Sequence, residues 1–250
     1  MPPGHADVSG RRVVITGAGR GLGRVLAIAF DSAGARLGLV SRGKDALEEL
    51  AGRLGHEALV CPGDVRDAEF NESVAAGMLE RFGGVDVWIC NAGVSPTVAA
   101  VADLTPDTWR EIVDVNLTGT FLGARAGAAV MGAGGRIIVT GSVLGDRPRG
   151  GLAAYSASKS GAQSLVGALA QELGPRGITV NAVALGWFDA GMGAHWRRDA
   201  ERDNAIVAHT ALGRWGTPAD LPGVYLFLAS DSSSYVTGAT VRVDGGYSLF

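Results

Sequence analysis

Cysteine is scarce in this chain, with only Cys61 and Cys90 among 250 residues. Small secreted domains often rely on several disulfides, whereas proteins of reducing compartments keep few, unpaired thiols. Both cysteines lie in apolar runs that have the character of β-strands, so we expect buried structural thiols. The low cysteine content therefore favours a reduced, cytoplasmic protein.

A segment that would bring the chain to a membrane is also missing. The first ten residues contain His5 and Asp7 and no apolar run, which is not the pattern of a signal peptide. No apolar stretch elsewhere is long enough to cross a bilayer as a helix. We therefore expect no signal peptide and no membrane partner.

Excess charge of one sign, repeats and low-complexity tracts are likewise absent. The formal net charge is −3 and the 22 Lys and Arg residues are scattered, so no basic stripe suggests a nucleic-acid partner. The 39 glycines are dispersed without a collagen or linker period. With 47% hydrophobic residues the chain can bury one sizeable core, and we expect residues 1–250 to form a single domain.

A phosphate-binding pattern lies near the N-terminus. A β-branched run, residues 12–16, stops at a glycine-rich segment, and a helix-like segment follows from residue 24 to about residue 33. Glycines let the backbone approach a pyrophosphate, which the N–H groups of the helix start then bind. The spacing departs from Gly-x-Gly-x-x-Gly, so a glycine-rich turn without a ligand is the alternative. The expected contacts are Gly17, Gly19, Arg20, Gly21, Leu22 and Gly23.

The end of the next strand indicates which dinucleotide fits. In dinucleotide folds an acid about 20 residues after the glycines binds the ribose 2′-hydroxyl of NAD, whereas an arginine suits the 2′-phosphate of NADP. Residues 35–41 are expected to form this strand, which ends in Ser41-Arg42 without a carboxylate. Arg20 could reach the same phosphate. We therefore expect NADP(H), and NAD(H) stays open because Arg42 could be a solvated turn residue.

Strands and helices continue to alternate along the rest of the chain. This alternation predicts an α/β fold: a Rossmann-type doubly wound parallel sheet of about seven strands with helices on both faces. Ligands of such sheets bind beyond the carboxyl ends of the strands, where Asn91, Ser142 and the loop after residue 183 all fall. The remaining strands are expected at residues 58–61, 85–90, 136–142, 178–183 and 239–243. Helices are expected at residues 45–54, 67–82 with Asp67 as N-cap, 105–131 begun by Thr105-Pro106-Asp107, 154–173, and after Thr217-Pro218-Ala219-Asp220.

Tyr155 and Lys159 lie four residues apart on the predicted helix of residues 154–173, so a phenol and an ammonium share one face. A free tyrosine has a pKa of about 10 and is a weak acid–base group near neutrality. A positive charge within a few ångströms favours the phenolate and lowers that pKa toward the range of an effective general acid or base. The alternative is an ordinary surface pair on an amphipathic helix.

Residues 186–216 form the one long stretch without a clear strand pattern. A loop of this length in a compact domain is usually functional or mobile. We interpret it as a substrate lid whose aromatic side chains line a pocket, with a pair of surface helices as the alternative. Its larger side chains are Trp187, Phe188, Met192, His195, Trp196, Arg197 and Arg198.

Together these motifs resemble the short-chain dehydrogenase/reductase family, and the resemblance extends from Arg12 to Tyr247. Each motif is weak alone, but their order along the chain and their places at strand ends are jointly specific. They are Thr16-Gly17-x-x-x-Gly21-x-Gly23, Asp64-Val65, Asn91-Ala92-Gly93, Asn116, Ser142, Tyr155-x-x-x-Lys159 and Val243-Asp244-Gly245-Gly246.

The resemblance implies a catalytic tetrad of Asn116, Ser142, Tyr155 and Lys159, without a metal site. Tyr155 would exchange a proton with the substrate oxygen, which Ser142 would hold. Lys159 would lower the tyrosine pKa and bind the nicotinamide ribose, and Asn116 would position a water in the proton relay. The cofactor would supply the hydride. The resemblance further implies cofactor contacts at Asp64 and Val65, which would meet the adenine, and at Asn91, Ala92, Gly93 and Gly186.

Three positions depart from the family pattern. Cys90 stands where the family often has an asparagine, without an expected chemical consequence. Leu185 and Ala190 stand where it usually has a proline and, a few residues on, a threonine that contacts the nicotinamide carboxamide. We therefore expect weaker anchoring of the carboxamide and an altered lid geometry.

The implied activity is that of an NADP(H)-dependent oxidoreductase that interconverts a ketone and a secondary alcohol. Similar chains include 3-oxoacyl-carrier-protein reductases and gluconate 5-dehydrogenases. The apolar lid favours a small, partly hydrophobic ketone, whereas an acyl-carrier-protein substrate would need a basic docking patch. NAD-linked oxidation of a polyol, and a nucleotide-sensing protein without chemistry, are the alternatives. Candidates for the basic patch are Arg125, Arg147, Arg149, Arg197 and Arg198.

The resemblance also implies an assembly, because family members are commonly tetramers. A homotetramer is expected, with a dimer as the alternative. Small residues on the Tyr155 helix would allow a close helix–helix interface, although they could equally pack on the sheet of their own chain. These residues are Ala157, Gly161, Ala162 and Ala168.

Overall fold

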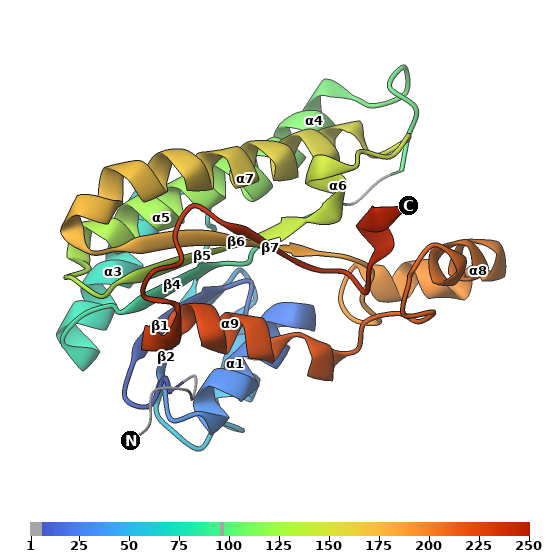
Figure 1. Cartoon of the computed structure of the whole chain (residues 1–250). Helices are drawn as coiled ribbons and strands as arrows, with labels where there is room; N and C mark the ends of the chain where they lie inside the picture. Colours follow the sequence, from blue (N-terminus) through green and yellow to red (C-terminus); the bar gives the residue numbers. More distant parts are fainter. Residues whose placement is uncertain (1–6, 96–97) are drawn as a thin grey trace.

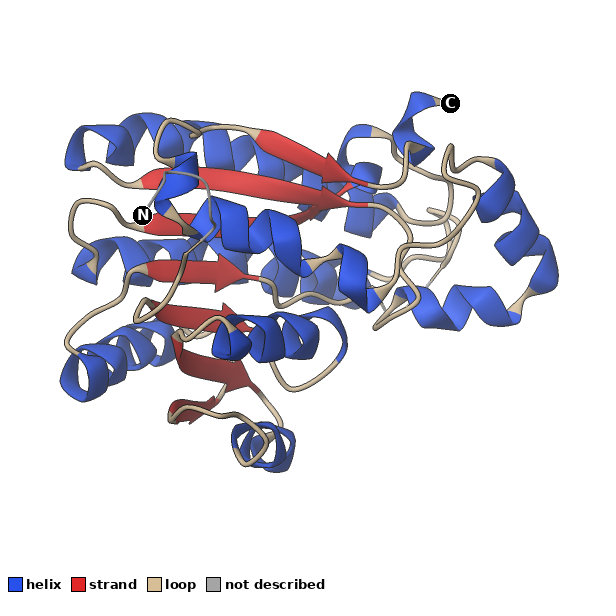
Figure 2. Ribbon diagram, turned by 60° about the horizontal axis from the view of Figure 1, so that its bottom comes forward, coloured by secondary structure: helices blue, strands red, loops and turns tan. Residues whose placement is uncertain are grey.

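The computed structural model describes residues 7–95 and 98–250 and shows a sheet of seven parallel strands in the order β3-β2-β1-β4-β5-β6-β7. The strands point toward the same edge of the sheet (Figure 2). The predicted α/β, Rossmann-type doubly wound sheet is confirmed. Its strands are β1 (Arg12–Thr16), β2 (Arg36–Ser41), β3 (Ala58–Pro62), β4 (Val87–Cys90), β5 (Arg136–Ser142), β6 (Thr179–Leu185) and β7 (Thr240–Val243).

Helices cover both faces of the sheet, with α5 and α7 on one face and α1 and α9 on the other (Figure 1). Parallel neighbours need crossover connections, and helices supply them. Within the described residues, no helix has the length and apolar character needed to cross a membrane. The helices are α1 (Gly21–Ser32), α2 (Lys44–Ala51), α3 (Ala68–Phe82), α4 (Pro106–Val113), α5 (Gly119–Val130), α6 (Val143–Asp146), α7 (Ala153–Leu173), α8 (Ala200–Ala208) and α9 (Pro222–Ala229).

The sheet is apolar on both sides, as a parallel sheet between two helical layers requires. On β1, Val14 belongs to the hydrophobic cluster formed with α3, α5 and α7, whereas Val13 and Ile15 belong to the cluster formed with α1, α2 and α9. Trp88 anchors the first cluster and Phe30 the second, and both side chains are fully buried. The core therefore lies in two layers and leaves the strand ends free for a site.

The two neighbours of β1 come from different parts of the chain. β2 pairs with it on one side, with Thr16 opposite Val40, and β4 pairs on the other, with Ile15 opposite Ile89. β1 is therefore the point at which the strand order reverses. The connections that leave the two sides of this point diverge, and a crevice remains at the carboxyl ends of the strands. The glycine loop follows β1 directly and so lies in this crevice.

The helix expected over residues 105–131 begins as predicted but is interrupted. Thr105 Oγ1 accepts the N–H of Thr108 at 3.1 Å, and Pro106 occupies the first turn. After α4 the chain passes through a π-helical turn, η1 (Asp114–Thr118), before α5 begins. The expectation of one uninterrupted helix is therefore corrected. The contacts that hold the wider turn come from distant segments, so the helical period does not reveal them.

At two other places, local residues determine where a helix begins. Asp67 caps α3 as predicted, because its carboxylate accepts the N–H of Glu69 at 2.9 Å. The segment after Thr217 instead forms a 3₁₀ turn, η4 (Pro218–Asp220), and α9 begins only at Pro222. A proline lacks the N–H that a helix interior needs and fits the first turn, so Pro222 sets the later start.

Both cysteines are free thiols, Cys90 buried and Cys61 half-buried. Burial raises the pKa of Cys61 to about 11. Burial also raises the pKa of Cys90 to about 12, against a small opposing effect of Lys159. Thiols held in this protonated state are poor nucleophiles, which agrees with the predicted structural role.

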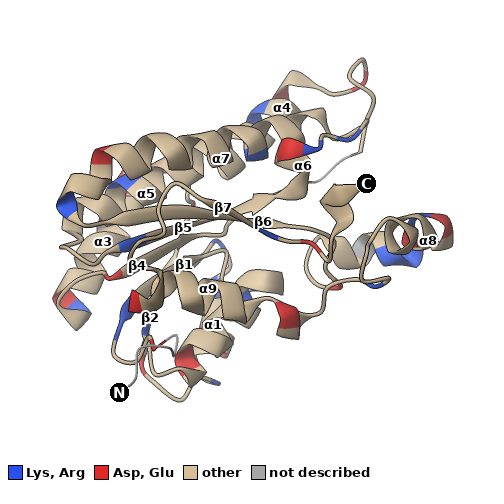
Figure 3. Cartoon of the chain, viewed as in Figure 1, with Lys and Arg blue, Asp and Glu red and all other residues tan. Residues whose placement is uncertain are grey.

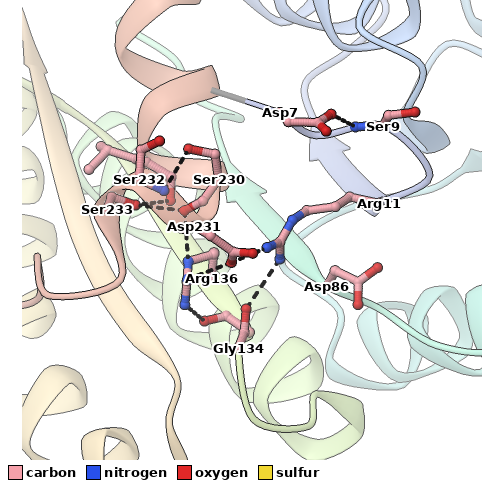
Figure 4. A network of polar contacts seen from close by, with 12 residues as sticks. Asp7, Ser9, Arg11, Asp86, Gly134, Arg136, Ser230, Asp231, Ser232 and Ser233 are labelled. Atoms are coloured by element: carbon pink, nitrogen blue, oxygen red, sulfur yellow. Dashed lines mark hydrogen bonds and ion pairs between the residues drawn. The ribbon is translucent and has the colours of Figure 1, made fainter. Parts of the chain in front are cut away.

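Arginine–aspartate contacts fix the edge of the sheet opposite the crevice (Figure 4). Arg11 donates to Asp231 at 2.5 Å and to the Gly134 carbonyl oxygen at 3.3 Å. Arg136, whose side chain is almost fully buried, donates to the same carboxylate at 3.3 Å. These contacts join the starts of β1 and β5 to the turn that follows α9. They therefore stabilise the edge of the sheet that lies opposite the crevice.

Candidate active site

A cavity of about 770 Å³ opens at the carboxyl ends of the central strands, a volume typical of small-molecule sites. Of the predicted tetrad, Ser142, Tyr155 and Lys159 line it and Asn116 does not. The residues predicted to contact the cofactor all line it: Gly17, Gly19, Arg20, Gly21, Leu22, Gly23, Ser41, Arg42, Asp64, Val65, Asn91, Ala92, Gly93, Tyr155, Lys159 and Gly186.

Two glycines allow the first loop to approach its neighbours closely. Gly17 has a φ of +72°, a left-handed conformation that residues with side chains disfavour. A Cβ at Gly17 would lie 3.0 Å from Ala92 Cα, and a Cβ at Gly23 would lie 2.1 Å from the Gly17 carbonyl oxygen. The loops after β1 and β4 and the first turn of α1 therefore meet at a distance that only glycine permits.

The start of α1 faces the cavity without a side-chain cap. Arg20, at the N-cap position, makes no side-chain cap hydrogen bond within the described structure, and no acidic residue lies in the first turn. The N–H groups of a helix start carry partial positive charge and favour an anion. The glycine cradle and this uncapped helix start thus fit the pyrophosphate of a dinucleotide.

Thr16, the last residue of β1, holds the loop after β4 in place. Its Oγ1 accepts the N–H of Asn91 at 2.9 Å and that of Ala92 at 3.0 Å. The Asn91 side chain donates to the Thr16 carbonyl oxygen at 2.9 Å and accepts from Thr140 Oγ1 at 3.3 Å. The sequence analysis did not identify this role of Thr16 and Thr140. For Thr16, the available signal was a hydroxyl at the end of a strand.

Ser142 and Tyr155 meet in the wall of the cavity. Ser142 ends β5, Tyr155 lies in the first turn of α7, and both side chains line the cavity. Burial raises the pKa of Tyr155 above its usual value, and hydrogen bonding from the nearby Ser142 hydroxyl opposes that rise. Ser142 Oγ also accepts the N–H of Leu144 at 3.2 Å, so the serine caps α6. The pair can thus hold an oxygen of a ligand between two hydroxyls.

Lys159 is buried one turn beyond Tyr155 on α7. Its Nζ donates to the Thr140 carbonyl oxygen at 2.6 Å and lies 5.9 Å from the centre of the Tyr155 ring. Burial lowers the pKa of Lys159 to about 8, with a small opposing effect of Cys90. Burial raises the pKa of Tyr155, so the net direction differs from the lowered pKa that the Tyr–Lys spacing predicts.

Asn116 is fully buried in the π turn η1. Its Oδ1 accepts the N–H of Val94 at 2.7 Å, and its Nδ2 donates to the Val94 carbonyl oxygen at 2.9 Å and to Ser158 Oγ at 3.1 Å. Ser158 Oγ in turn donates to the Tyr155 carbonyl oxygen at 2.7 Å. Asn116 thus connects the loop after β4 to α7, and the water-positioning role expected of it stays a prediction.

Comparisons with known proteins agree with this geometry. The family model described as Enoyl-(Acyl carrier protein) reductase matches residues 17–248. The galactitol 2-dehydrogenase (L-tagatose-forming) of Cereibacter sphaeroides is 37% identical over 249 residues, covering 97% of this chain and 97% of that protein. The cyclohexanol dehydrogenase of Rhodococcus sp. (strain TK6) is 35% identical over 265 residues, again covering 97% of each.

A solved structure is similar over the whole length. It is that of a Beutenbergia cavernae protein, provisionally named an NAD(P)-dependent gluconate 5-dehydrogenase, with NADP bound at low occupancy. Its TM-score with this chain is 0.90 at 36% identity, covering 99% of this chain and all of that one. The chain belongs to the short-chain dehydrogenase/reductase family. It is an oxidoreductase of this family that acts on CH–OH groups with NAD(P).

Residues 186–216, the segment predicted to form a substrate lid, leave β6 and return where Phe188 forms a parallel bridge with Gly216. Between these two residues lie a 3₁₀ helix, η3 (Gly193–Arg198), and α8. A pair of helices was the alternative interpretation of this segment, and its role as a substrate lid stays a prediction. The side chain of His195, one of the predicted lid residues, lies outside the described part of the structure.

Aromatic side chains of the lid form one connected cluster. The Trp187 ring packs against Trp196 with ring centres 5.2 Å apart, against Trp215 at 5.8 Å and against Tyr247 at 6.1 Å. Of the predicted lid residues, Arg197 and Arg198 do not line the cavity; those that do are Trp187, Phe188, Met192 and Trp196. One wall of the cavity therefore consists largely of aromatic and other uncharged side chains.

Two of the three positions that depart from the family pattern line the cavity, and the third lies buried near Lys159. Leu185 and Ala190 both line the cavity. Cys90 is buried close enough to Lys159 for the charge of each group to affect the pKa of the other. The expected weaker anchoring of the carboxamide stays a prediction.

Among the residues that the structure describes, four charged ones line the cavity: Arg20, Arg42, Asp64 and Lys159. Arg20 and Arg42 are exposed at its rim, and Lys159 lies at the other end. The Asp64 carboxylate also lines it but accepts a hydrogen bond from Arg66 Nη2 at 2.6 Å. Hydrogen bonds from Arg66, with the charge of Arg42 adding to them, hold the pKa of Asp64 below its usual range.

The five arginines considered for a docking patch do not form one group. Arg125 lies on α5 and pairs with Glu72, whereas Arg197 precedes α8 and pairs with Asp189. α5 and α8 lie at opposite ends of the molecule in Figure 1. In Figure 3 positively and negatively charged residues are interspersed along the ribbon, on α8 as elsewhere in the view. A single basic surface that contains both Arg125 and Arg197 is therefore not formed.

Proposed function

We propose that the chain is an NADP(H)-dependent oxidoreductase that interconverts a ketone and a secondary alcohol. The observation that carries this proposal is that the Ser142 and Tyr155 hydroxyl groups lie together in the cavity wall, with the buried Lys159 one turn further along α7. Two hydroxyls that converge on one point can hold a carbonyl oxygen and supply its proton.

In the proposed reduction the substrate oxygen lies between Ser142 and Tyr155. The Tyr155 hydroxyl gives its proton to this oxygen, and Ser142 holds the oxygen by a hydrogen bond throughout. When bound, the reduced nicotinamide supplies the hydride to the carbonyl carbon. Lys159, with its pKa of about 8, supplies positive charge beside the nicotinamide ribose and steadies the phenolate that remains. Oxidation of the alcohol reverses each of these steps.

Loss of reduced-nicotinamide absorbance tests the proposal, with NADPH and NADH compared over ketones, keto-sugars, β-ketoacyl thioesters and an enoyl thioester. Turnover of a ketone with NADPH is the expected result. Tight cofactor binding without turnover of any of these substrates would instead favour a nucleotide-sensing protein. Alcohol oxidation with NAD in preference to NADP would support the alternative of an NAD-linked polyol dehydrogenase.

The preference for NADP(H) rests on Arg20 and Arg42. Both are exposed at the rim of the cavity where β2 ends in Ser41, without a carboxylate at the strand tip. A guanidinium binds a phosphate with paired, charge-assisted hydrogen bonds. The NADP bound to the Beutenbergia cavernae protein supports the same preference.

The Arg42→Ala variant is expected to lose about tenfold in kcat/KM for NADPH, the loss of one charge-assisted hydrogen bond at an exposed site. The kcat/KM for NADH should stay within about twofold, because NADH lacks the 2′-phosphate. Steady-state kinetics with both cofactors measures this. Arg36→Ala is the matched control, since Arg36 is exposed at the other end of β2. An equal loss with both cofactors would contradict the assignment.

The substrate that fits best is an uncharged ketone with an apolar ring. Beyond the two hydroxyls, the lining of the cavity includes the apolar residues Val94, Leu144, Leu152, Trp187 and Met192, with Ser95 as a further polar residue. Flat apolar rings pack well on indole surfaces. Cyclohexanol is the named substrate of one relative and galactitol that of another. We therefore expect cyclic ketones to have a higher kcat/KM than keto-sugars.

A cytoplasmic homotetramer, with a dimer as the alternative, remains our proposal for the assembly. On α7 the small residues Ala157, Ser160, Ser164 and Ala168 are exposed at helical spacing, and Phe121 is exposed on the neighbouring α5. Such a face supports close packing of a second copy. Ala162, by contrast, is buried in the core of its own chain and is removed from the predicted interface set.

A further inference from the structure

The Gln163 side chain connects α7 to the end of β5. Gln163 follows Tyr155 and Lys159 at successive intervals of four residues, so the three side chains share one face of α7. Its Oε1 accepts the backbone N–H of Ser142 at 3.1 Å, and its Nε2 donates to Asp146 Oδ1 at 3.0 Å. One amide therefore holds both the strand residue and the short helix α6 that follows it.

Two glycines make room for this amide. A Cβ at Gly141 would lie 2.9 Å from Gln163 Oε1, and a Cβ at Gly145 would lie 2.5 Å from the same oxygen. The Gly145 Cβ would also come within 3.1 Å of the Lys159 carbonyl carbon. β5, α6 and α7 thus approach each other closely around the amide, which fixes its position.

The partner of the amide is anchored in turn. Asp146 ends α6 and also accepts a hydrogen bond from Arg242 Nη2 on β7 at 3.1 Å. The chain of contacts therefore runs from β7 through Asp146 and Gln163 to the N–H of Ser142. Ser142 is buried, so its N–H needs a partner within the protein.

We propose that Gln163 is a positioning residue for the reaction: it fixes the backbone of Ser142 and thereby aims the Ser142 hydroxyl at Tyr155. The inference rests on the proposed function. Ser142 Oγ has a second partner, the N–H of Leu144 at 3.2 Å. Without the amide of Gln163, the residue can turn toward this alternative and away from the phenol.

The Gln163→Met variant is expected to lower kcat about ten- to hundredfold, the size of effect that a small misplacement of a reacting group produces. The Kd for NADPH should stay within about twofold, because Gln163 does not line the cavity. The acid limb of kcat/KM for alcohol oxidation should move to higher pH. The hydrogen bond with Ser142 lowers the pKa of Tyr155, so weakening it raises the pH at which the phenolate forms.

Matched variants separate positioning from stability. Gln171→Met, two turns further along α7 and exposed, should behave as wild type. Gln163→Glu keeps an acceptor for the Ser142 N–H but not the donor for Asp146, and it should lose less kcat than Gln163→Met. If Gln163→Met does not fold, the Gln163→Glu variant provides the test of positioning in its place. Melting temperatures of all variants identify any general loss of structure.

A double-mutant cycle with Ser142→Ala decides whether Gln163 acts through the serine hydroxyl. In the Ser142→Ala background, Gln163→Met should cause little further loss of kcat. An undiminished loss there, or a Gln163→Met enzyme with the kcat and pH profile of wild type, would overturn the inference while leaving the proposed function intact. Wild-type protein without Tyr155-dependent turnover would overturn both.

Discussion

Replacing Tyr155 with phenylalanine is expected to lower kcat about 10²- to 10⁴-fold, the usual contribution of a positioned general acid–base group. The substitution removes one hydroxyl, the one that lies near Ser142, and keeps the aromatic ring that lines the cavity. Because the ring stays, the Kd for NADPH should change by less than about threefold. The effect should therefore appear in kcat and not in cofactor binding.

Turnover and a fluorescence titration with NADPH measure the two quantities separately. Tyr235→Phe is the matched control, because the Tyr235 side chain is fully exposed and should tolerate the same loss of a hydroxyl. A Tyr155→Phe protein that keeps more than about a tenth of wild-type kcat would remove Tyr155 from the acid–base role. Ser142 and bound water would then be the remaining candidates for the proton donor.

Replacing Gly23 with alanine is expected to impair cofactor binding severely. The added Cβ would lie 2.1 Å from the Gly17 carbonyl oxygen and 2.7 Å from Asn91 Nδ2, so the loop after β1 must move away from the start of α1. Overpacking of this kind costs about 1–3 kcal/mol. If this free energy is lost from the cofactor-bound conformation of the glycine loop, the affinity for NADPH falls roughly 5- to 150-fold.

Gly43→Ala provides the control for this substitution. Gly43 also lines the cavity, its φ is −88°, and a Cβ there would meet no atom within 4 Å. The Kd of the Gly43→Ala variant for NADPH should stay within about twofold of the wild-type value. Its melting temperature should stay within a few degrees of the wild-type value. If Gly23→Ala bound NADPH as tightly as Gly43→Ala, the close approach of loop and helix would not be needed for binding.

The sheet could be predicted from the sequence because its determinants are local. Short β-branched runs, each bounded by glycine or a polar residue, alternate with helical periods, and the strand positions are confirmed to within about two residues. β4 begins at Val87 where residue 85 was expected, and β6 extends to Leu185 where residue 183 was expected. Pairing with neighbouring strands decides where a strand ends, and a single run of residues does not contain that information.

Features that depend on tertiary contact were missed for the same reason. The π turn at Asn116 is held by Val94, 22 residues away, and by Ser158 on α7. Likewise, Gln163 gains its role only when the end of β5 folds against α7. The direction of the pKa shift at Tyr155 differed from expectation because it depends on burial, which the Tyr–Lys spacing does not show.

In the proposed reaction, hydride reaches a carbonyl carbon while Tyr155 protonates the oxygen. Reduction of a cyclic ketone with NADPH that carries deuterium at both C4 positions tests this transfer, with the product examined by mass spectrometry and NMR. We expect one deuterium on the carbinol carbon. No incorporation, or deuterium on a carbon of a reduced C=C bond when an enoyl thioester is the substrate that turns over, would contradict it.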